Sequence, residues 1–311
     1  MHAHTKCSKW SVWSYQIPLR KPLAVLGGAG TTRKGWILGR FNKYLSKWEY
    51  GEISPIENFH KIELFDVYKD ISNTVRNKSK PTTALVKTVF DVWNTPSTDG
   101  TVSINSLLDS NSNTSTIEQR TIKVKVGRQS LEHDIEWFTS LQRNHPQVIW
   151  RIDCNRQWTL DQLRTFWRIC DPTTIEYIED PLCDPALLEY VPEIPIALDE
   201  SLLEFQTLLD CPNVTAAIIK PTLHLNWQQL LTRYPTVKGV ISSTFEGSLG
   251  IWGLGQLALN HIHNGTHGLG TLDWFAEEIV APPLHYTMQE LYLPSKAPSP
   301  LFSKLHWEDG E

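Results

Sequence analysis

The sequence has no long hydrophobic run. None of its stretches reaches about 18 consecutive apolar residues, the length that a membrane-spanning helix needs. The opening residues, MHAHTKCSKWSVWSY, also lack the apolar core of a secretory signal peptide. We therefore expect no membrane partner and predict a cytoplasmic protein.

Cysteine pairs and basic clusters are missing as well. The five cysteines are scattered and contain no Cys-x-x-Cys pair: Cys7, Cys154, Cys170, Cys183 and Cys211. This pattern is typical of reduced thiols in a cytosolic protein. The net charge is −5, the pI is near 6.1 and no basic stripe occurs, so a nucleic-acid partner is not expected.

Nucleotide-binding motifs are absent too. The glycine-rich segment 27–30 does not follow the Gly-x-Gly-x-x-Gly pattern, and no Walker lysine and hydroxyl come after it. A nucleotide cofactor is therefore not predicted.

What the sequence does contain is two successive patterns. In residues 1–95, strand-like segments precede segments whose apolar residues recur with helical spacing, which indicates an α+β domain. We predict strands over 10–17, 35–41 and 47–53, and helices over 58–75 and 82–93. The turn-rich segment 94–100 predicts a domain boundary.

Strands and helices alternate after this boundary. Eight short strands with intervening helices predict a closed parallel barrel over residues 96–285. The predicted strands are 102–107, 122–126, 148–153, 175–179, 194–199, 216–220, 238–243 and 268–271. The predicted helices are 131–143, 160–169, 202–209, 227–234 and 247–261. Segment 109–120, between the first two strands, is polar and unlikely to form a helix, so we expect an irregular barrel there.

Two lysines stand on one face of the second predicted strand. Side chains alternate along a strand, so Lys123 and Lys125 point the same way, and Ile122, Val124 and Val126 point the other way. Repulsion between two ammonium groups lowers a lysine pKa, and such a lysine is a candidate base. The alternative is an edge strand with a solvated lysine face.

Carboxylates end the next three strands, and catalytic groups of such barrels lie at the carboxyl ends of the strands. Asp153, Glu179 and Asp199 are therefore expected to converge at the barrel mouth, with Lys220 on the wall opposite the lysine pair. Three carboxylates suit Mg²⁺, unless each is an ordinary helix N-cap. A carboxylate substrate on Mg²⁺ would lose its neighbouring proton to a lysine and form an enediolate.

These residues together resemble the enolase superfamily, in its muconate lactonizing enzyme-like subgroup. The resemblance rests on Gly-Glu-Ile-Ser-Pro at 51–55, Lys-x-Lys at 123–125, Arg-x-Asp-x-Asn at 151–155, Glu-Asp-Pro at 179–181, Asp-Glu-Ser at 199–201 and Ile-Lys-Pro at 219–221. It implies a modified (β/α)7β TIM-type barrel with an N-terminal α+β capping domain, on which the tail 286–311 packs. Within the superfamily, the chain is most similar to the o-succinylbenzoate synthase family.

The resemblance implies a role for each residue. Lys125 is the base and then the acid, Lys123 adjusts Lys125, and Lys220 stabilises the enediolate. The three carboxylates hold Mg²⁺, with Mn²⁺ as a substitute. The implied reaction is a syn dehydration of 2-succinyl-6-hydroxy-2,4-cyclohexadiene-1-carboxylate to 2-succinylbenzoate, a precursor of menaquinone or phylloquinone.

Further positions follow from the same resemblance. The backbone N–H groups of four residues are expected to bind the succinyl carboxylate, unless the residues serve strand-end packing: Ser242, Ser243, Gly268 and Gly270. Arg151 and Asn155 are expected in the wall of the site. Segment 22–35 is expected to be a flexible loop over the substrate, with an ordinary exposed loop as the alternative. The alternatives are an N-acylamino acid racemase or dipeptide epimerase, or a barrel without catalysis. No oligomeric state is predicted.

Overall fold

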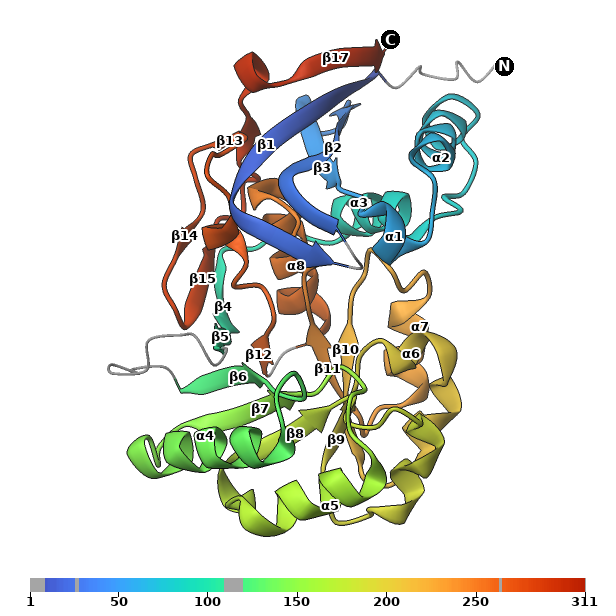
Figure 1. Ribbon diagram of the computed structural model, residues 1–311. Coiled ribbons are helices and arrows are strands. Elements are labelled where there is room, and N and C mark those ends of the chain that lie inside the picture. The colour runs from blue at the N-terminus through green and yellow to red at the C-terminus, as the bar shows by residue number, and fades with distance from the viewer. Residues whose placement is uncertain (1–8, 26–27, 109–119, 263–264, 311) are drawn as a thin grey trace.

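A computed structural model describes residues 9–25, 28–108, 120–262 and 265–310. A cap built on an antiparallel sheet stands above a barrel of parallel strands (Figure 1). The predicted fold class is confirmed. In the described part of the chain, no helix is long and apolar enough to cross a membrane.

The cap sheet has the strand order β17-β1-β2-β3. Two helices, α2 and α3, cover one face of the sheet, where Val67 and Val89 pack against Val12 and Leu38. The other face, with Ile17 and Ile37, joins the core of the barrel. The elements are β1 (Trp10–Val25), β2 (Gly28–Asn42), β3 (Lys47–Ile53), α1 (Glu57–His60), α2 (Leu64–Arg76), α3 (Ala84–Asn94) and β17 (His306–Gly310).

Strands β1 and β2 form one long hairpin. They extend well beyond the predicted strands, and the hairpin reaches down to the barrel mouth (Figure 1). The expectation of a flexible loop over 22–35 is therefore wrong for the described residues, since 22–25 and 28–35 continue the two strands. Register explains why: Leu23 lies opposite Gly30, and Ile17 lies opposite Arg33. The predicted helix 58–75 is likewise two helices, because Lys61 ends α1 in a left-handed conformation with φ of 51°.

The barrel is a curled parallel sheet in the order β11-β10-β9-β8-β7-β6-β5. Its edges join through β12, which pairs with β4, and through a bridge from Ser242 to Gly268. The strands are β4 (Gly100–Ile104), β5 (Ser106–Leu108), β6 (Thr121–Lys125), β7 (Ile149–Asp153), β8 (Ile175–Glu179), β9 (Ile196–Leu198), β10 (Val214–Ile219), β11 (Lys238–Ile241) and β12 (Thr266–His267). The first predicted strand is thus split at Asn105, and the segment between it and β6, residues 109–119, lies outside the described residues.

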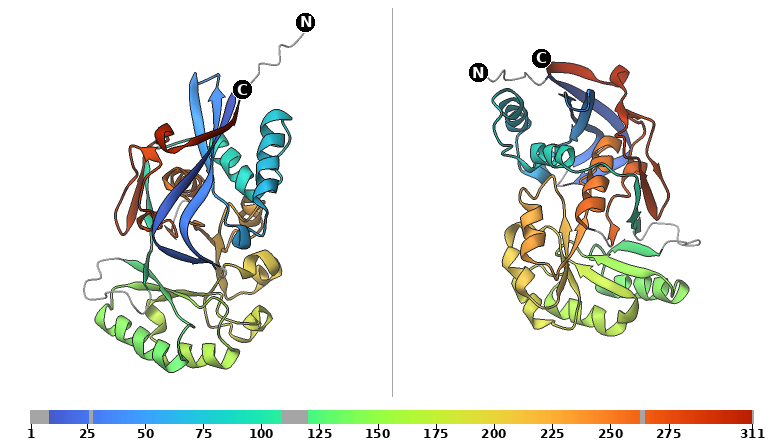
Figure 2. Two further views of the ribbon diagram at one scale, coloured as in Figure 1. Left: turned by 45° about the horizontal axis from the view of Figure 1, so that its top comes forward. Right: turned by 180° about the vertical axis from the view of Figure 1, so that it is seen from behind.

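Helices surround this sheet (Figure 2). They are α4 (Leu131–Asn144), α5 (Leu160–Ile169), α6 (Ser201–Glu204), α7 (Trp227–Arg233) and α8 (Ser248–His261), with 3₁₀ turns η1 (Pro172–Thr174), η2 (Pro185–Tyr190) and η3 (Gln206–Asp210). Only the predicted helix 202–209 differs clearly, because it divides into α6 and η3. Helix α8 is apolar on nearly every side, as expected for a helix enclosed between cap and barrel.

The end of the chain contributes to both parts. Strand β15 pairs antiparallel with β4 of the barrel, and β17 pairs with β1 of the cap. The remaining elements are η4 (Leu272–Trp274), β13 (Val280–Ala281), β14 (His285–Tyr286), β15 (Glu290–Leu293), β16 (Ser299–Pro300) and η5 (Phe302–Lys304). The domain limits themselves, 1–95 and 96–285, stay a prediction.

A buried carboxylate joins the cap to the barrel. Glu52, on β3, accepts hydrogen bonds from the backbone N–H of Gly247 at 2.7 Å and of Gly250 at 2.9 Å, so it caps the N-terminus of α8. The Tyr15 hydroxyl donates to the same carboxylate at 2.6 Å. A side chain at Gly250 would collide with Glu246, whose Cβ would lie 2.5 Å from the added Cβ. The Gly-Glu-Ile-Ser-Pro segment therefore has a structural role between the two parts.

Arg33 makes a second connection. Its Nη1 donates to the Pro55 carbonyl at 2.5 Å, within the cap, and its Nε donates to the Phe245 carbonyl of the barrel at 2.8 Å. The guanidinium is buried, and its donors point to fixed carbonyl groups on both parts. These contacts therefore hold the cap against the loop that follows β11.

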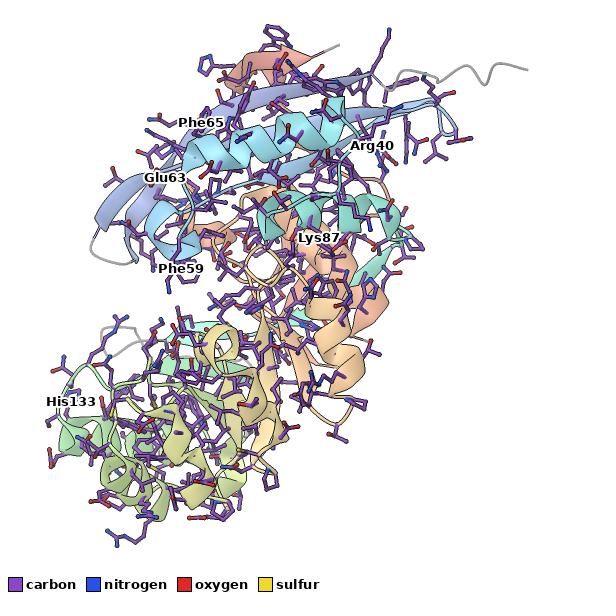
Figure 3. All side chains as sticks on the ribbon, turned by 90° about the vertical axis from the view of Figure 1, so that its right-hand side faces the viewer. Arg40, Phe59, Glu63, Phe65, Lys87 and His133 are labelled. Atoms are coloured by element: carbon purple, nitrogen blue, oxygen red, sulfur yellow. The ribbon has the colours of Figure 1, made fainter. Side chains whose placement is uncertain are left out.

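Replacing Glu52 tests how much its contacts between cap and barrel contribute to the free energy of unfolding. We expect Glu52→Ala to lower the free energy of unfolding by about 3 kcal/mol, because it leaves two N–H groups and a hydroxyl buried without their acceptor. Urea unfolding followed by circular dichroism measures this. Glu63→Ala is the control, since Glu63 is exposed and its side chain does not cap α2 (Figure 3). Equal losses for the two variants would contradict the role of Glu52.

Candidate active site

Strand register brings the predicted residues to one rim of the barrel. Lys125, Asp153 and Glu179 are lateral partners on the adjacent strands β6, β7 and β8. Asp199 directly follows β9, and Lys220 directly follows β10. Since the strands are parallel, all of these side chains belong to the end of the barrel that faces the cap (Figure 1).

Each carboxylate contacts a lysine. The Nζ atom of Lys123 lies 3.0 Å from Oδ2 of Asp153 and hydrogen-bonds to Glu179. Lys125 is held less closely, with its Nζ 3.5 Å from Oδ2 of Asp153. Lys220 donates to Asp199 on the other side of the site. The alternative in which each acid serves only as a helix N-cap does not describe these contacts.

Charge is unevenly shared among the carboxylates. Burial acts to raise the pKa of Asp153, but Lys123 and Lys125 outweigh it and lower this pKa to about 2. At Glu179, burial and the neighbouring charges of Asp153 and Asp199 prevail over Lys123, so its pKa is raised well above the ordinary value. The Lys123 ammonium thus lies between two buried carboxylates, and at Glu179 burial and like charges outweigh its effect on the pKa.

The expected lowering of the lysine pKa is wrong for Lys123. Burial would lower this pKa, but Asp153 and Glu179 outweigh burial and raise it well above the ordinary value. The same holds at Lys220, where Asp199 overcomes the effect of burial. Repulsion within the lysine pair is therefore weaker than attraction to the carboxylates, which a single strand cannot reveal.

Whether these carboxylates suit a metal ion depends on the lysines. In the described ranges, no three His, Cys, Asp or Glu side chains converge closely enough to hold an ion as they stand. The donor set nevertheless has the right chemistry, because it comprises three buried carboxylates on neighbouring strands, and the pKa of Glu179 is raised by burial and by the charges of the other two. Asn155 supports this set by donating from Nδ2 to Oδ1 of Asp153 at 2.9 Å. The residues fit a divalent cation if the ammonium groups give up their carboxylate contacts.

Arg151 lies below this rim rather than in the open wall. Its guanidinium is 1% exposed, with Nε 2.7 Å from Glu176 and Nη1 2.8 Å from the Thr266 carbonyl. The guanidinium has almost no exposed surface through which it could contact a substrate. Its predicted role in substrate binding stays a prediction. Asn155 is half-buried at the rim, and its observed partner is Asp153.

The expected anion site at the last two strands is wrong in part. The backbone N–H groups of Ser242, Ser243 and Gly268 donate to Ile219, Gly268 and Ile241, at 2.8, 3.0 and 2.8 Å, so they hold the barrel together. Added at Gly268, a Cβ would lie 2.7 Å from Oγ of Ser242, which supports the packing alternative. Gly270 is exposed, and its role stays a prediction.

Strand β1 is tied to the segment around η4. Nε of Arg20 donates to the Phe275 carbonyl at 2.8 Å, and Nζ of Lys21 lies 3.9 Å from the ring centroid of Trp274. These contacts anchor this part of β1.

Two residues beside Lys220 were not predicted from the sequence. The ring of Phe59, from α1 of the cap, lies with its centroid 5.3 Å from Nζ of Lys220. The imidazole of His224 accepts the backbone N–H of Lys220 on Nδ1 at 3.0 Å. A lone phenylalanine in a short helix gives no sequence signal for such a contact.

Comparison with known proteins shows which proteins this chain is similar to. Residues 114–220 match the model of the family described as Enolase C-terminal domain-like. The o-succinylbenzoate synthase of Pasteurella multocida (strain Pm70) is 31% identical over 180 residues, which are 53% of this chain and 53% of that protein. The chain spans about half the length of the curated relatives it matches.

Solved structures share the fold over more of the chain. The o-succinylbenzoate synthase of Thermosynechococcus elongatus BP-1, solved with Mg in the active site, has a TM-score of 0.70 and 22% identity, covering 87% of this chain and 95% of that one. A dipeptide epimerase from Enterococcus faecalis V583, solved with Mg and L-Leu-L-Tyr, has a TM-score of 0.71 and 17% identity, covering 96% and 99%. The matched segment 114–220 carries all three lysines and all three carboxylates, and over this segment the chain is similar to the Enolase C-terminal domain-like family.

Three histidines should make stability depend on pH. Burial lowers the pKa of His60, His224 and His267 from 6.5 to about 4. Since the folded pKa is below the unfolded one, the unfolded chain binds more protons between these values, and stability falls as pH falls from 6.5 to 4. We expect a loss of up to about 3 kcal/mol per histidine, measured by urea unfolding across this range.

Replacing one of these histidines with a residue that does not titrate tests this pH dependence. His267 accepts the N–H of Ile241 on Nδ1 at 3.0 Å, and an asparagine oxygen can accept the same bond. His267→Asn should remove about a third of the slope, because His60 and His224 contribute the rest. His133→Asn, on the exposed side of α4, should leave the slope unchanged (Figure 3). A slope that survives His267→Asn in full would contradict the assignment.

Proposed function

We propose that the chain is an o-succinylbenzoate synthase, a carbon–oxygen lyase. Its reaction is the Mg²⁺-dependent syn dehydration of 2-succinyl-6-hydroxy-2,4-cyclohexadiene-1-carboxylate to 2-succinylbenzoate, a precursor of menaquinone or phylloquinone. The observation that carries the proposal is the meeting of three lysines and three carboxylates at one rim, all inside the segment that matches the family model. The similarity to o-succinylbenzoate synthases over half the chain supports the choice of reaction.

The carboxylates of Asp153, Glu179 and Asp199 would hold the Mg²⁺ ion. When bound, the ion supplies positive charge that stabilises the enediolate formed from the substrate carboxylate. Three solved relatives of the same fold contain magnesium, which supports this assignment. Mn²⁺ as a substitute belongs to the same proposal.

Lys125 is the proposed base. Its side chain is 26% exposed, compared with 19% for Lys123 and 9% for Lys220, so it is the most accessible of the three. Its shortest carboxylate contact, 3.5 Å to Asp153, is longer than the shortest contact of Lys123 or of Lys220, which leaves it the freest to turn toward a substrate. Nζ of Lys125 would remove the proton next to the substrate carboxylate and then give it to the departing hydroxyl on the same face, which is a syn elimination.

Lys220 has a different task. Its ammonium is paired with Asp199, and that carboxylate raises its pKa against the effect of burial. A lysine held in the charged form stabilises negative charge on the enediolate but does not readily remove a proton. This supports dehydration, which needs one base, over racemisation, which needs a base on each face.

A dipeptide epimerase or N-acylamino acid racemase is the second candidate. The observation that favours it is the presence of lysines on two walls of the site, together with the shared fold of two solved epimerases. A barrel without catalysis is less well supported, because every proposed catalytic position is filled by the required residue type.

A spectroscopic assay tests the proposal. Purified protein with Mg²⁺ and the cyclohexadiene substrate should deplete the ultraviolet band of the diene, and removal of the metal with EDTA should stop the reaction. Lys125→Ala should lower turnover by at least about 10³-fold because the base is lost, while thermal stabilisation by Mg²⁺ persists. The control is Lys69→Ala, on the exposed side of α2.

Two results would overturn parts of this proposal. A stable diene band, with racemisation of N-succinyl amino acids instead, would replace the dehydratase with the second candidate. Near-normal turnover of Lys125→Ala would refute its role as the base.

Glu179 should show a trade-off between stability and metal binding. Because burial and like charges raise its pKa, Glu179→Gln should not lower the unfolding temperature of the metal-free protein, yet it should remove most of the stabilisation by millimolar MgCl₂. Differential scanning fluorimetry measures both quantities.

Glu176→Gln is the matched control on the same strand. Glu176 lies 2.7 Å from Nε of Arg151 and pairs with Lys238, so its loss should lower the unfolding temperature and keep the Mg²⁺ effect. The assignment fails if Glu179→Gln keeps the full stabilisation by Mg²⁺.

A further inference from the structure

The cap reaches one of the proposed catalytic lysines directly. Lys220 is nearly enclosed, with only 9% of its side chain exposed. Asp199 and, at 3.8 Å, Glu200 contact its ammonium from the barrel, and the centroid of the Phe59 ring lies 5.3 Å from its Nζ on the side of the cap. Figure 3 places Phe59 on the rim of the cap that faces the barrel. The ammonium therefore has two carboxylates from the barrel and an aromatic ring from the cap as neighbours.

The short helix α1 holds this ring in place. Its first turn is closed by His60, whose Nδ1 accepts the N–H of Ile56 at 2.9 Å. The His60 ring meets the Phe59 ring edge to face, with centroids 5.6 Å apart. The helix ends at Lys61, whose Nζ lies 3.9 Å from Glu204 on α6 of the barrel. The direction of the Phe59 side chain is thus fixed by its own helix.

An aromatic ring attracts an ammonium group through the negative charge of its face, and the attraction is stronger where water is excluded. A leucine of similar size would fill the same space without this attraction. Asp199 and Glu200 both lie on the barrel side of the ammonium, so the ring is the contact that holds this flexible side chain from the side of the cap.

We propose that Phe59 is a positioning residue that holds the ammonium of Lys220 on the wall opposite Lys125. The capping domain thereby completes the lysine pair, although both lysines belong to the barrel. This inference rests on the proposed function, in which Lys220 stabilises the enediolate. Phe59 acts through Lys220, so its loss should change the rate of the chemical step more than substrate binding.

Kinetics of three variants test the inference. Phe59→Leu should lower kcat about tenfold with KM changed less than about twofold. Phe59→Tyr keeps an aromatic face and should stay within about twofold of the wild type. Phe65→Leu is the matched control, because Phe65 is 75% exposed at the start of α2, and it should behave as the wild type (Figure 3). A Phe59→Leu enzyme with normal kcat, or with a change in KM alone, would overturn the inference.

A chemical measurement decides the question without catalysis. Brief acetylation of the whole protein with acetic anhydride, followed by peptide mass spectrometry, reports how freely Lys220 reacts. Modification of Lys220 should rise several-fold in Phe59→Leu and stay unchanged in Phe59→Tyr and Phe65→Leu. Equal modification in all four proteins would overturn the inference even if the wild type dehydrates the substrate. A wild type that leaves the substrate intact, with Lys220 released in Phe59→Leu, would refute the proposed function alone.

Discussion

The rest of the site depends on three carboxylates that are buried at the ends of adjacent strands. Asp153, Glu179 and Asp199 lie in a region with little water, where unbalanced negative charge is costly. Lys123 and Lys220 supply part of the balance, but Glu179 still has a pKa raised well above its ordinary value. The three carboxylates make the rim suitable for a divalent cation, and the lysines make it suitable for a substrate that becomes an anion.

The cap is coupled to this rim through a few polar and aromatic contacts. Glu52 caps α8, Arg33 joins the cap to the loop after β11, and Phe59 lies against Lys220. These contacts differ in kind from the apolar core, because each requires one defined placement of the cap. The position of the cap and the placement of Lys220 are therefore linked, and a substrate enclosed between cap and barrel would meet both lysine walls.

Sequence patterns predicted the barrel and the six residues of the rim because both depend on local features, namely strand alternation and the residue type at each strand end. They did not predict the contact of Glu52 with Gly247, which are 195 residues apart, or the role of Phe59. The pKa of Lys123 was predicted in the wrong direction, since its decisive partners lie on other strands. The N–H groups near Gly268 were misassigned because strand pairing at the barrel closure is not visible in one segment.

A crystal structure with Mg²⁺ and 2-succinylbenzoate tests the account most directly. The account predicts a metal ion on the carboxylates of Asp153, Glu179 and Asp199, with the ammonium groups of Lys123 and Lys220 moved away from them. It also predicts the ring of the product between Lys125 and Lys220. A structure in which the lysines keep their present carboxylate contacts, and the metal or the product binds elsewhere, would contradict it.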